Sequence, residues 1–488
     1  MSPLAVTPLP EGVRLDLDPS VRAFRGGSVL TGGFPGRLVT LTKEGMRAVA
    51  RLTGGGPVSE ADRRLGRRLV TAGMAHPRLA GDGGSDPGAS VTVVVPVRDR
   101  SPSLDRCLAA LGDAVPVVVV DDGSHDPGAV AAVCARHGAR LLRRPRSGGP
   151  GAARNDGIDV LDSELVALVD SDCTAEGVWL EALTPMFADP DLGAAAPRVR
   201  PRRHGAAPSV LDRFADARSP LDMGRERGEV GPGRKIRYVP TTALVARRTA
   251  MAGGFDPDLR VGEDVDLIWR MCDAGHRVRF EPAVTVWHDE PTTWRAWFGR
   301  RFRYGTSGAP LARRHPGRLA PVELRAWPSA IAAAGLGRHP AVAGAMVLVW
   351  GALTARSVRG RGIPFVVVLR WGAAAAGWTT VGLGRALTML AAPAVPLAIG
   401  LRPRWTLAGA ALVLAPPLTE WWKKRPALDP VRWSLCCIAD DVSYGAGVWA
   451  GCVRSRSFGP LLPALRARQW AAVADPVFDA TTGAVAVV

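Results

Sequence analysis

The pattern of apolar and polar positions divides the chain into three parts. Between residues 91 and about 290, short apolar runs alternate with segments whose apolar residues recur every three or four positions. Short apolar runs bounded by polar residues predict buried strands, and the longer periodicity predicts helices. Strands and helices in alternation indicate parallel strands joined by crossovers, and therefore an α/β fold.

The strand predicted at the centre of this part ends in two carboxylates. The apolar run 165–169 is followed by Asp170 and Asp172, with one serine between them. Open α/β sheets bind ligands at the carboxyl ends of their strands. In extended backbone, residues i and i+2 point to the same side, so we expect both carboxylates to face one site. Such oxygens suit Mg²⁺ or Mn²⁺, which usually also holds substrate phosphates. A polar loop after a strand would show the same short sequence.

Two more strand ends carry candidate ligand-binding residues. The first expected strand ends at Pro96, Val97 and Arg98, and the second ends at Asp121 and Asp122. Acidic side chains at this edge can accept hydrogen bonds from a ribose or a base, although Asp-Asp-Gly-Ser is also a turn sequence. The glycine-rich segment 147–157 follows, and its small residues can present free N–H groups to an anion at the start of a helix. Arg154 in this segment can contact a phosphate or brace the acidic cluster.

The last candidates are Glu263, Asp264 and His288. Glu263 and Asp264 open a predicted helix, where the helix dipole stabilises carboxylates, and this could be their whole role. His288 lies just beyond a predicted strand. A single histidine is usually structural, but a neutral imidazole is also a good metal ligand.

Residues 91 to about 290 resemble the family 2 glycosyltransferases. The sequences V-V-V-P-V-R, D-D-G-S, G-x-x-x-A-R-N-x-G, D-S-D, G-G-F-D and G-E-D-x-D-L occur in the order and spacing of that family. The resemblance implies a GT-A fold, which is Rossmann-like with a mostly parallel sheet, and metal-dependent, inverting hexosyl transfer. It implies a general base, Asp264, beside Glu263, and a divalent metal, Mg²⁺ or Mn²⁺, on Asp172 and His288. It places the nucleotide-sugar at Pro96, Val97, Arg98, Asp121, Asp122, Arg154 and Asp170.

The N-terminal part, residues 1–85, predicts a small separate module. Alternating residues predict strands near 13–17 and 37–41, and Thr42 opens a helix that Gly54 to Gly56 stop. Ser59 and Asp62 have the spacing of a capping box at the start of a second helix. This pattern resembles winged-helix modules and, more narrowly, the PqqD-like peptide-recognition domains. A structural cap without ligand is the alternative. A flexible linker is expected at 81–90.

The last part, residues 301–488, is a basic linker followed by apolar segments. The candidates are 340–355, 363–384, 386–400, 405–418 and 435–453. A membrane span needs about 20 apolar residues, and several of these are short. Arg370 interrupts one segment, and Asp440 with Asp441 interrupts the last. Basic and tryptophan residues flank the segments like membrane anchors. We expect association with the cell membrane, with the catalytic domain on the cytoplasmic side. A soluble helical domain is the alternative.

The charge of the chain suits these partners. It has 62 Lys and Arg against 45 Asp and Glu, a net charge of +17, which favours phosphate-bearing substrates or an anionic membrane. Zinc-finger, RRM and KH signatures are missing, so nucleic acid is not an expected partner. Seven scattered cysteines without a C-x-x-C pair indicate reduced thiols.

The combination of the three parts resembles the glycosyltransferases of the mycofactocin system. That resemblance implies transfer of glucose, with UDP-glucose as donor, to a peptide-derived redox cofactor or its growing oligosaccharide. A membrane enzyme acting on a lipid or cell-envelope glycan is an alternative, and a non-catalytic sugar-nucleotide or peptide-binding scaffold is another. The Q-x-x-R-W sequence of processive members is missing, and its nearest equivalent is 297–303.

Overall fold

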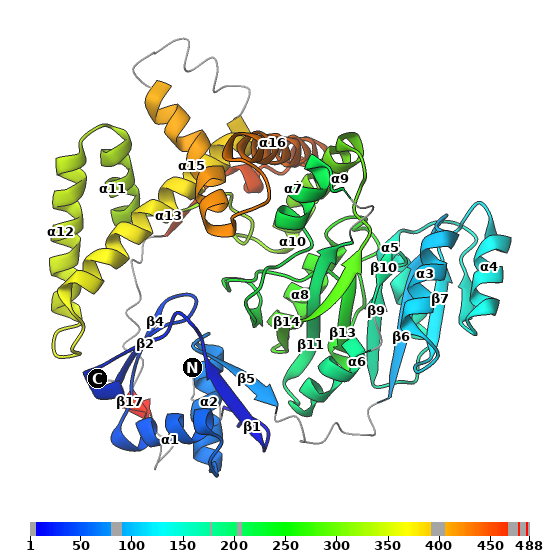
Figure 1. Cartoon of the computed structure of the whole chain (residues 1–488), viewed down its shortest axis with the longest axis horizontal. Helices are drawn as coiled ribbons and strands as arrows, with labels where there is room; N and C mark the ends of the chain where they lie inside the picture. The colour runs from blue at the N-terminus through cyan, green and yellow to red at the C-terminus, as the bar shows by residue number, and fades with distance from the viewer. Residues whose placement is uncertain are drawn as a thin grey trace.

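The computed structural model describes residues 6–79, 90–175, 178–202, 207–391, 406–466, 477–478 and 485–486. Figure 1 shows three regions: an N-terminal module, a central sheet with its helices, and a group of C-terminal helices that reaches from one to the other. The predicted linker at 81–90 lies outside the described residues, except for Ser90.

The N-terminal module contains two small sheets and two helices. Strand β1 (Val13–Leu17) pairs antiparallel with β5 (Ala75–Leu79), and β2 (Arg22–Phe24), β3 (Val29–Gly32) and β4 (Arg37–Thr40) form an antiparallel sheet. Helix α1 (Lys43–Gly54) begins after Thr42, whose side chain accepts from the Gly45 N–H. Helix α2 (Glu60–Thr71) begins with the predicted capping box of Ser59 and Asp62. The expected helix starts are therefore confirmed.

The central sheet has nine strands in the order β10-β14-β11-β13-β9-β6-β7-β8, with β12 paired to β14. Strands β9, β6, β7 and β8 are mutually parallel, and β13 runs antiparallel to both of its neighbours. The α/β fold is thus confirmed, with the parallel half formed by the sequence-predicted strands. The bounds are β6 Val91–Val97, β7 Val117–Asp121, β8 Arg140–Arg143, β9 Leu165–Val169, β10 Cys173–Thr174, β11 Leu192–Pro201, β12 Gly228–Val230, β13 Ala243–Arg247 and β14 Arg277–His288.

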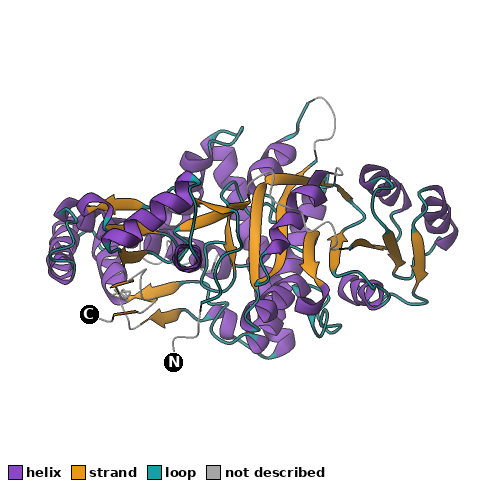
Figure 2. Cartoon of the chain, turned by 90° about the horizontal axis from the view of Figure 1, so that it is seen from below, coloured by secondary structure: helices purple, strands orange, loops and turns teal. Residues whose placement is uncertain are grey.

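Helices cover both faces of this sheet (Figure 2). The reason is visible along β6, where Val93 and Val95 belong to one buried cluster and Val94 belongs to the other. Helices α3 (Ser101–Leu111), α4 (Pro127–Arg136) and α6 (Val178–Leu183) contribute to the first cluster. Helices α5 (Pro150–Asp159) and α8 (Glu263–Asp273) contribute to the second. A sheet buried on both faces needs the continuous apolar strands that the sequence shows.

The C-terminal region is helical. Its helices are α9 (Trp294–Thr306), α10 (Gly308–Arg314), α11 (Ala326–Leu336), α12 (Pro340–Ser357), α13 (Phe365–Ala391), α15 (Thr406–Lys424) and α16 (Pro430–Ser455). Short strand pairs β15 (Glu323–Arg325) with β16 (Ala464–Arg466) and β17 (Val477–Phe478) with β18 (Val485–Ala486) complete it. The expected boundary at residue 300 falls inside α9. Among the described residues, α12 and α13 are long and apolar enough to cross a membrane. Residues 392–400 of the candidate 386–400, and residue 405 of the candidate 405–418, lie outside the described residues.

The expected span at 435–453 is wrong. These residues belong to α16, which is not one of the two candidate spans and instead packs on α9. Asp440 and Asp441 are buried in that contact, where their carboxylates meet side chains from the catalytic part. The backbones approach closely, because a Cβ atom at Gly447 would lie 2.0 Å from the Phe302 carbonyl oxygen. Glycine at this position therefore lets α16 dock on the sheet domain.

Candidate active site

The two carboxylates after β9 lie in a turn. The Cys173 N–H donates to the Asp170 carbonyl at 2.9 Å, which closes the chain on itself immediately after the strand. The expected extended backbone is therefore wrong, although both carboxylates still line one cavity, as expected. Asp170 and Asp172 have different partners, so they can have different tasks.

Arg154 links Asp170 to the start of α8. Its guanidinium donates to Asp170 Oδ1 at 2.6 Å and to Glu263 Oε1 at 3.1 Å, and the side chain is buried. Burial opposes its charge, but Asp170 and Glu263 outweigh that effect and hold the pKa of Arg154 above its usual value. Of the two roles considered for Arg154, the structure places it as a brace between carboxylates. Contact with a phosphate remains a prediction.

Asp172 faces His288 because of the sheet register. Strand β10 pairs antiparallel with the end of β14, so that Cys173 lies opposite His288. The distance between Asp172 Oδ1 and His288 Nε2 is 3.6 Å. Arg100 forms an ion pair with the other oxygen of Asp172. The family resemblance named Asp172 and His288 as a pair, and the structure brings these two residues together across 116 positions of sequence.

These donors fit a divalent metal that is shared with a diphosphate. Two ligands bound at about 2.1 Å to one ion lie roughly 3–4 Å apart, which matches the Asp172–His288 distance. Within the described residues, groups of three or more metal-binding side chains were not found. A site with two protein ligands is what Mg²⁺ accepts when phosphate oxygens and water supply the rest. His288 Nδ1 is buried without a hydrogen-bond partner, and Glu290 Oε1 lies 3.8 Å from it.

Asp264 is the titratable group whose properties best suit a general base. It stands in the first turn of α8, and its Oδ1 accepts from the Val265 N–H at 2.8 Å. Burial, and then the negative charge of Glu263, raise the pKa of Asp264 to about 7. Burial also raises the pKa of Glu263. The Glu263 side chain is held in place by its hydrogen bond from Arg154. A base with a pKa near neutral pH is poised to accept a proton.

The residues expected to contact the nucleotide share the edge formed by β6 and β7. Asp122 accepts from Ser147 Oγ at 2.6 Å and from the N–H groups of Gly148 and Gly149 at 2.8 and 2.9 Å. Its own N–H donates to the Val97 carbonyl at 2.8 Å. Asp122 thus fixes the glycine-rich segment against the end of β6.

Three more of the expected residues lie at this edge. Arg98 Nη1 donates to Ser147 Oγ at 3.2 Å, and Pro96 belongs to β6. Asp121 is fully buried, accepts from the Ser124 N–H at 2.8 Å and pairs with Arg143. The structure therefore brings the expected residues together. Their contact with a nucleotide stays a prediction.

A cavity of about 880 Å³ opens over Asp170 and Asp172. Helix α9 forms one wall of it, and the sequence pattern had not assigned these residues to the site. The residues of α9 and the preceding loop that line the cavity include Glu290, Arg295, Gly299, Arg300, Arg303 and Tyr304. The available signal was segment 297–303, the counterpart of the missing Q-x-x-R-W sequence. Burial of the phenol raises the pKa of Tyr304 to about 12, and the charges of Glu290 and Asp264 add to this shift.

Comparison with known proteins agrees with this architecture. Residues 92–252 match the model of "Glycosyl transferase family 2". The pre-mycofactocin glycosyltransferase of Mycobacterium tuberculosis is 35% identical over 484 residues, which cover 95% of this chain and 100% of the relative.

The chain belongs to the pre-mycofactocin glycosyltransferase family.

More distant proteins are similar to part of the chain. The probable glycosyltransferase YdaM of Bacillus subtilis is 26% identical over 44% of this chain and 54% of its own. Among solved structures, the mannosyltransferase PcManGT from Pyrobaculum calidifontis, in complex with GDP-Man and Mn²⁺, covers 70% of this chain and 90% of its own. Its TM-score is 0.37, at 20% identity.

Proposed function

We propose that this glycosyltransferase moves a glucose unit from UDP-glucose to a hydroxyl of a peptide-derived redox cofactor precursor, or of its growing oligosaccharide, with inversion at the anomeric carbon. Family membership supports the acceptor class. Two observations carry the mechanism: the raised pKa of Asp264 at the start of α8, and the Asp172–His288 pair that lines the cavity.

The site residues have distinct tasks in this proposal. Asp264 accepts the proton of the acceptor hydroxyl while that oxygen attacks the anomeric carbon from the face opposite the diphosphate. Glu263 is held by Arg154 and cannot turn toward the acceptor, so it raises the pKa of Asp264 instead. Asp172 and His288 would hold a divalent metal, which neutralises the charge that builds on the leaving diphosphate.

The assignment of the base is tested by two matched variants. Asp264→Asn keeps the shape of the side chain but cannot accept the proton. We expect single-turnover sugar transfer to fall by about 10²–10⁴-fold, with unchanged affinity for UDP-glucose. Glu263→Gln should lose less, since its neighbour Asp264 remains. Transfer at the wild-type rate by Asp264→Asn would remove it from the reaction.

We also propose the domain roles expected from the sequence: peptide recognition by residues 1–85, glycosyl transfer by 91–300, and a basic linker with a membrane-associated region over 301–488. A buried ion pair between domains supports a fixed position for the N-terminal module. Arg67 donates from both terminal nitrogens to the Asp189 carboxylate, each at 2.6 Å. Arg67→Met removes this ion pair. We expect the variant to bind the acceptor more weakly and the nucleotide-sugar donor as tightly as the wild type.

Membrane association is proposed from the surface of the C-terminal helices. Large apolar side chains that are exposed on them include Val342, Leu348, Val349, Leu353, Leu407, Leu414, Trp422, Leu435 and Val453. An exposed apolar surface on these helices would mark an interaction site. We expect the protein in the membrane fraction, with the sheet domain accessible to protease from the cytoplasmic side. Full recovery in the soluble fraction without detergent would contradict this proposal.

A further inference from the structure

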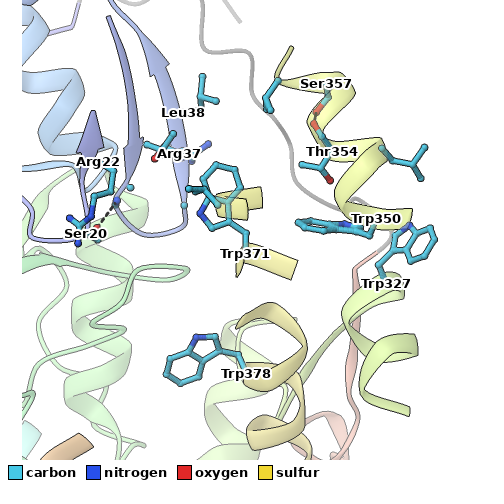
Figure 3. Close-up of a pocket in the computed structure, with 17 residues that line it drawn as sticks. Ser20, Arg22, Arg37, Leu38, Trp327, Trp350, Thr354, Ser357, Trp371 and Trp378 are labelled. Atoms are coloured by element: carbon cyan, nitrogen blue, oxygen red, sulfur yellow. Dashed lines mark hydrogen bonds between the residues drawn. The ribbon is translucent and has the colours of Figure 1, made fainter. Parts of the chain in front are cut away.

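A second cavity, of about 680 Å³, lies between the N-terminal module and the C-terminal helices. It shares no lining residue with the cavity over Asp170 and Asp172. Four tryptophans line it: Trp327 of α11, Trp350 of α12, and Trp371 and Trp378 of α13. Figure 3 shows these rings on the helical side, opposite the strands that carry Arg22 and Arg37.

Direct packing fixes the two sides of this cavity against each other. Leu38 of β4 packs against the buried cluster of Trp350, Val358 and Val368. Arg25 Nη1 donates to the Gly360 carbonyl at 2.8 Å, which ties the module to the loop between α12 and α13. The cavity is therefore a built feature of the folded chain, made by residues more than 300 positions apart.

A glycine of α13 shows how closely Trp350 is packed. A Cβ atom at Gly372 would lie 2.7 Å from the ring of Trp350. Glycine there lets the indole approach the α13 backbone closely. Rigid aromatic walls of this kind favour flat ligands, because stacking costs little side-chain entropy.

The charged side chains that line the cavity are positive. Among the residues that the structure describes, its lining includes two arginines and neither Asp nor Glu. Arg22 is already bonded, since its Nη1 donates to the carbonyls of Pro19 and Val21 at 2.7 and 2.9 Å. Among the described contacts, the Arg37 side chain has no hydrogen bond and no ion pair, while its backbone belongs to the β3–β4 ladder. Its guanidinium, half-buried at the cavity, is thus available to an anion.

We propose that this cavity binds a small ligand with a flat aromatic body and one carboxylate. The tryptophans stack on the aromatic body, and Arg37 donates to the carboxylate. The volume lies within the range of about 300–1,000 Å³ that small-molecule sites occupy. Because each half of the wall comes from a different region, the ligand stabilises the docking of the N-terminal module on the helices. This binding is independent of sugar transfer.

The test is calorimetric titration of the full-length protein with N-acetyl-L-tyrosine. N-acetyl-L-tyrosinamide keeps the ring and removes the charge, and dodecanoate keeps the charge and removes the ring. We expect saturable binding of N-acetyl-L-tyrosine and binding at least about tenfold weaker for the other two. Equal binding of the amide would overturn the role of the charge, and tighter binding of dodecanoate would overturn the aromatic ligand in favour of a lipid.

Variants locate the binding in this cavity. Arg37→Gln should weaken N-acetyl-L-tyrosine about tenfold and leave the amide unaffected. Trp371→Leu should weaken both ligands. Arg47→Gln, an exposed arginine of the same module on α1, is the control and should change neither. Asp172→Ala, which impairs the proposed transfer reaction, should also bind normally, so the two proposals fail separately. Unchanged affinity in Arg37→Gln and Trp371→Leu would overturn the site.

Discussion

The indole nitrogen of Trp297 donates a hydrogen bond to Asp440 at 2.9 Å, across 143 residues of sequence. The same carboxylate oxygen accepts from Arg301 Nε at 2.8 Å. Both donors belong to α9, whose other side chains Arg300 and Tyr304 line the catalytic cavity. A charged residue of the C-terminal helix therefore holds one wall of the candidate active site.

Replacement of Asp440 should disturb the position of α9 at the cavity. Asp440→Ala leaves the buried Trp297 N–H and the half-buried Arg301 guanidinium without their acceptor, at a cost of about 1–3 kcal/mol in the free energy of unfolding. Asp440→Asn keeps an acceptor for Trp297 and should lose less. In the Asn variant we expect a raised acceptor KM with unchanged UDP-glucose affinity, measured by initial rates and by titration. A drop in donor affinity of the same size would show a general loss of structure instead.

The metal prediction concerns Asp172. Asp172→Ala removes one of two protein ligands, so Mn²⁺ bound in the presence of UDP should weaken, since the diphosphate loses its bridging cation. Titration with Mn²⁺, followed by its electron paramagnetic resonance signal, measures this directly. Transfer should fall in parallel and recover in part at high Mn²⁺. Asp258→Ala, on an exposed turn, is the control. Full activity of Asp172→Ala with a chelator present would exclude the metal role.

The raised pKa of Asp264 predicts the pH dependence of the reaction. The base must be ionised, so kcat/KM should rise with pH and level off above about pH 7. Since the charge of Glu263 contributes to this shift, Glu263→Gln should move the rising limb to lower pH. A rate profile that is flat from pH 5 to 8 would contradict the assignment of Asp264.

The same shift makes a prediction for stability. The folded pKa of Asp264 lies above the usual value of 3.8, so the folded protein binds the proton more tightly than the unfolded chain. Its contribution to the free energy of unfolding is complete below pH 3.8 and is lost as the pH rises through about 7. Asp264→Asn should therefore reduce the fall in stability between pH 5 and 8, as measured by urea denaturation.

Arg154 should be essential for folding around the site. Arg154→Met leaves Asp170 and the buried Glu263 without their shared cation, and we expect a loss of about 3–5 kcal/mol. Arg154→Lys keeps the charge but cannot reach both carboxylates with a planar group, so it should recover stability only in part. Thermal unfolding of the two variants gives the comparison. Equal stability of Arg154→Met and the wild type would contradict the role as a brace.

The sequence by itself determined the sheet domain and most of its site. The apolar runs that became β6, β7 and β9 are local signals, because a strand buried on both faces needs uninterrupted apolar residues. The acids that follow these strands had to meet at one edge, since parallel strands bring their carboxyl ends together. The starts of α1 and α2 were also readable, because a capping side chain bonds within its own turn.

The tertiary structure decided what depends on contacts between distant segments. The pairing of Asp172 with His288 follows from the register of β10 on β14, and the bracing role of Arg154 follows from α8 docking beside β9. The clearest case is Asp440 and Asp441. In the sequence they interrupt an apolar stretch, and in the fold they are buried against Trp297, Arg301 and Arg218. A hydropathy value treats each charged residue by itself. Only the packed structure shows the opposite charges and hydrogen-bond donors that allow Asp440 and Asp441 to be buried.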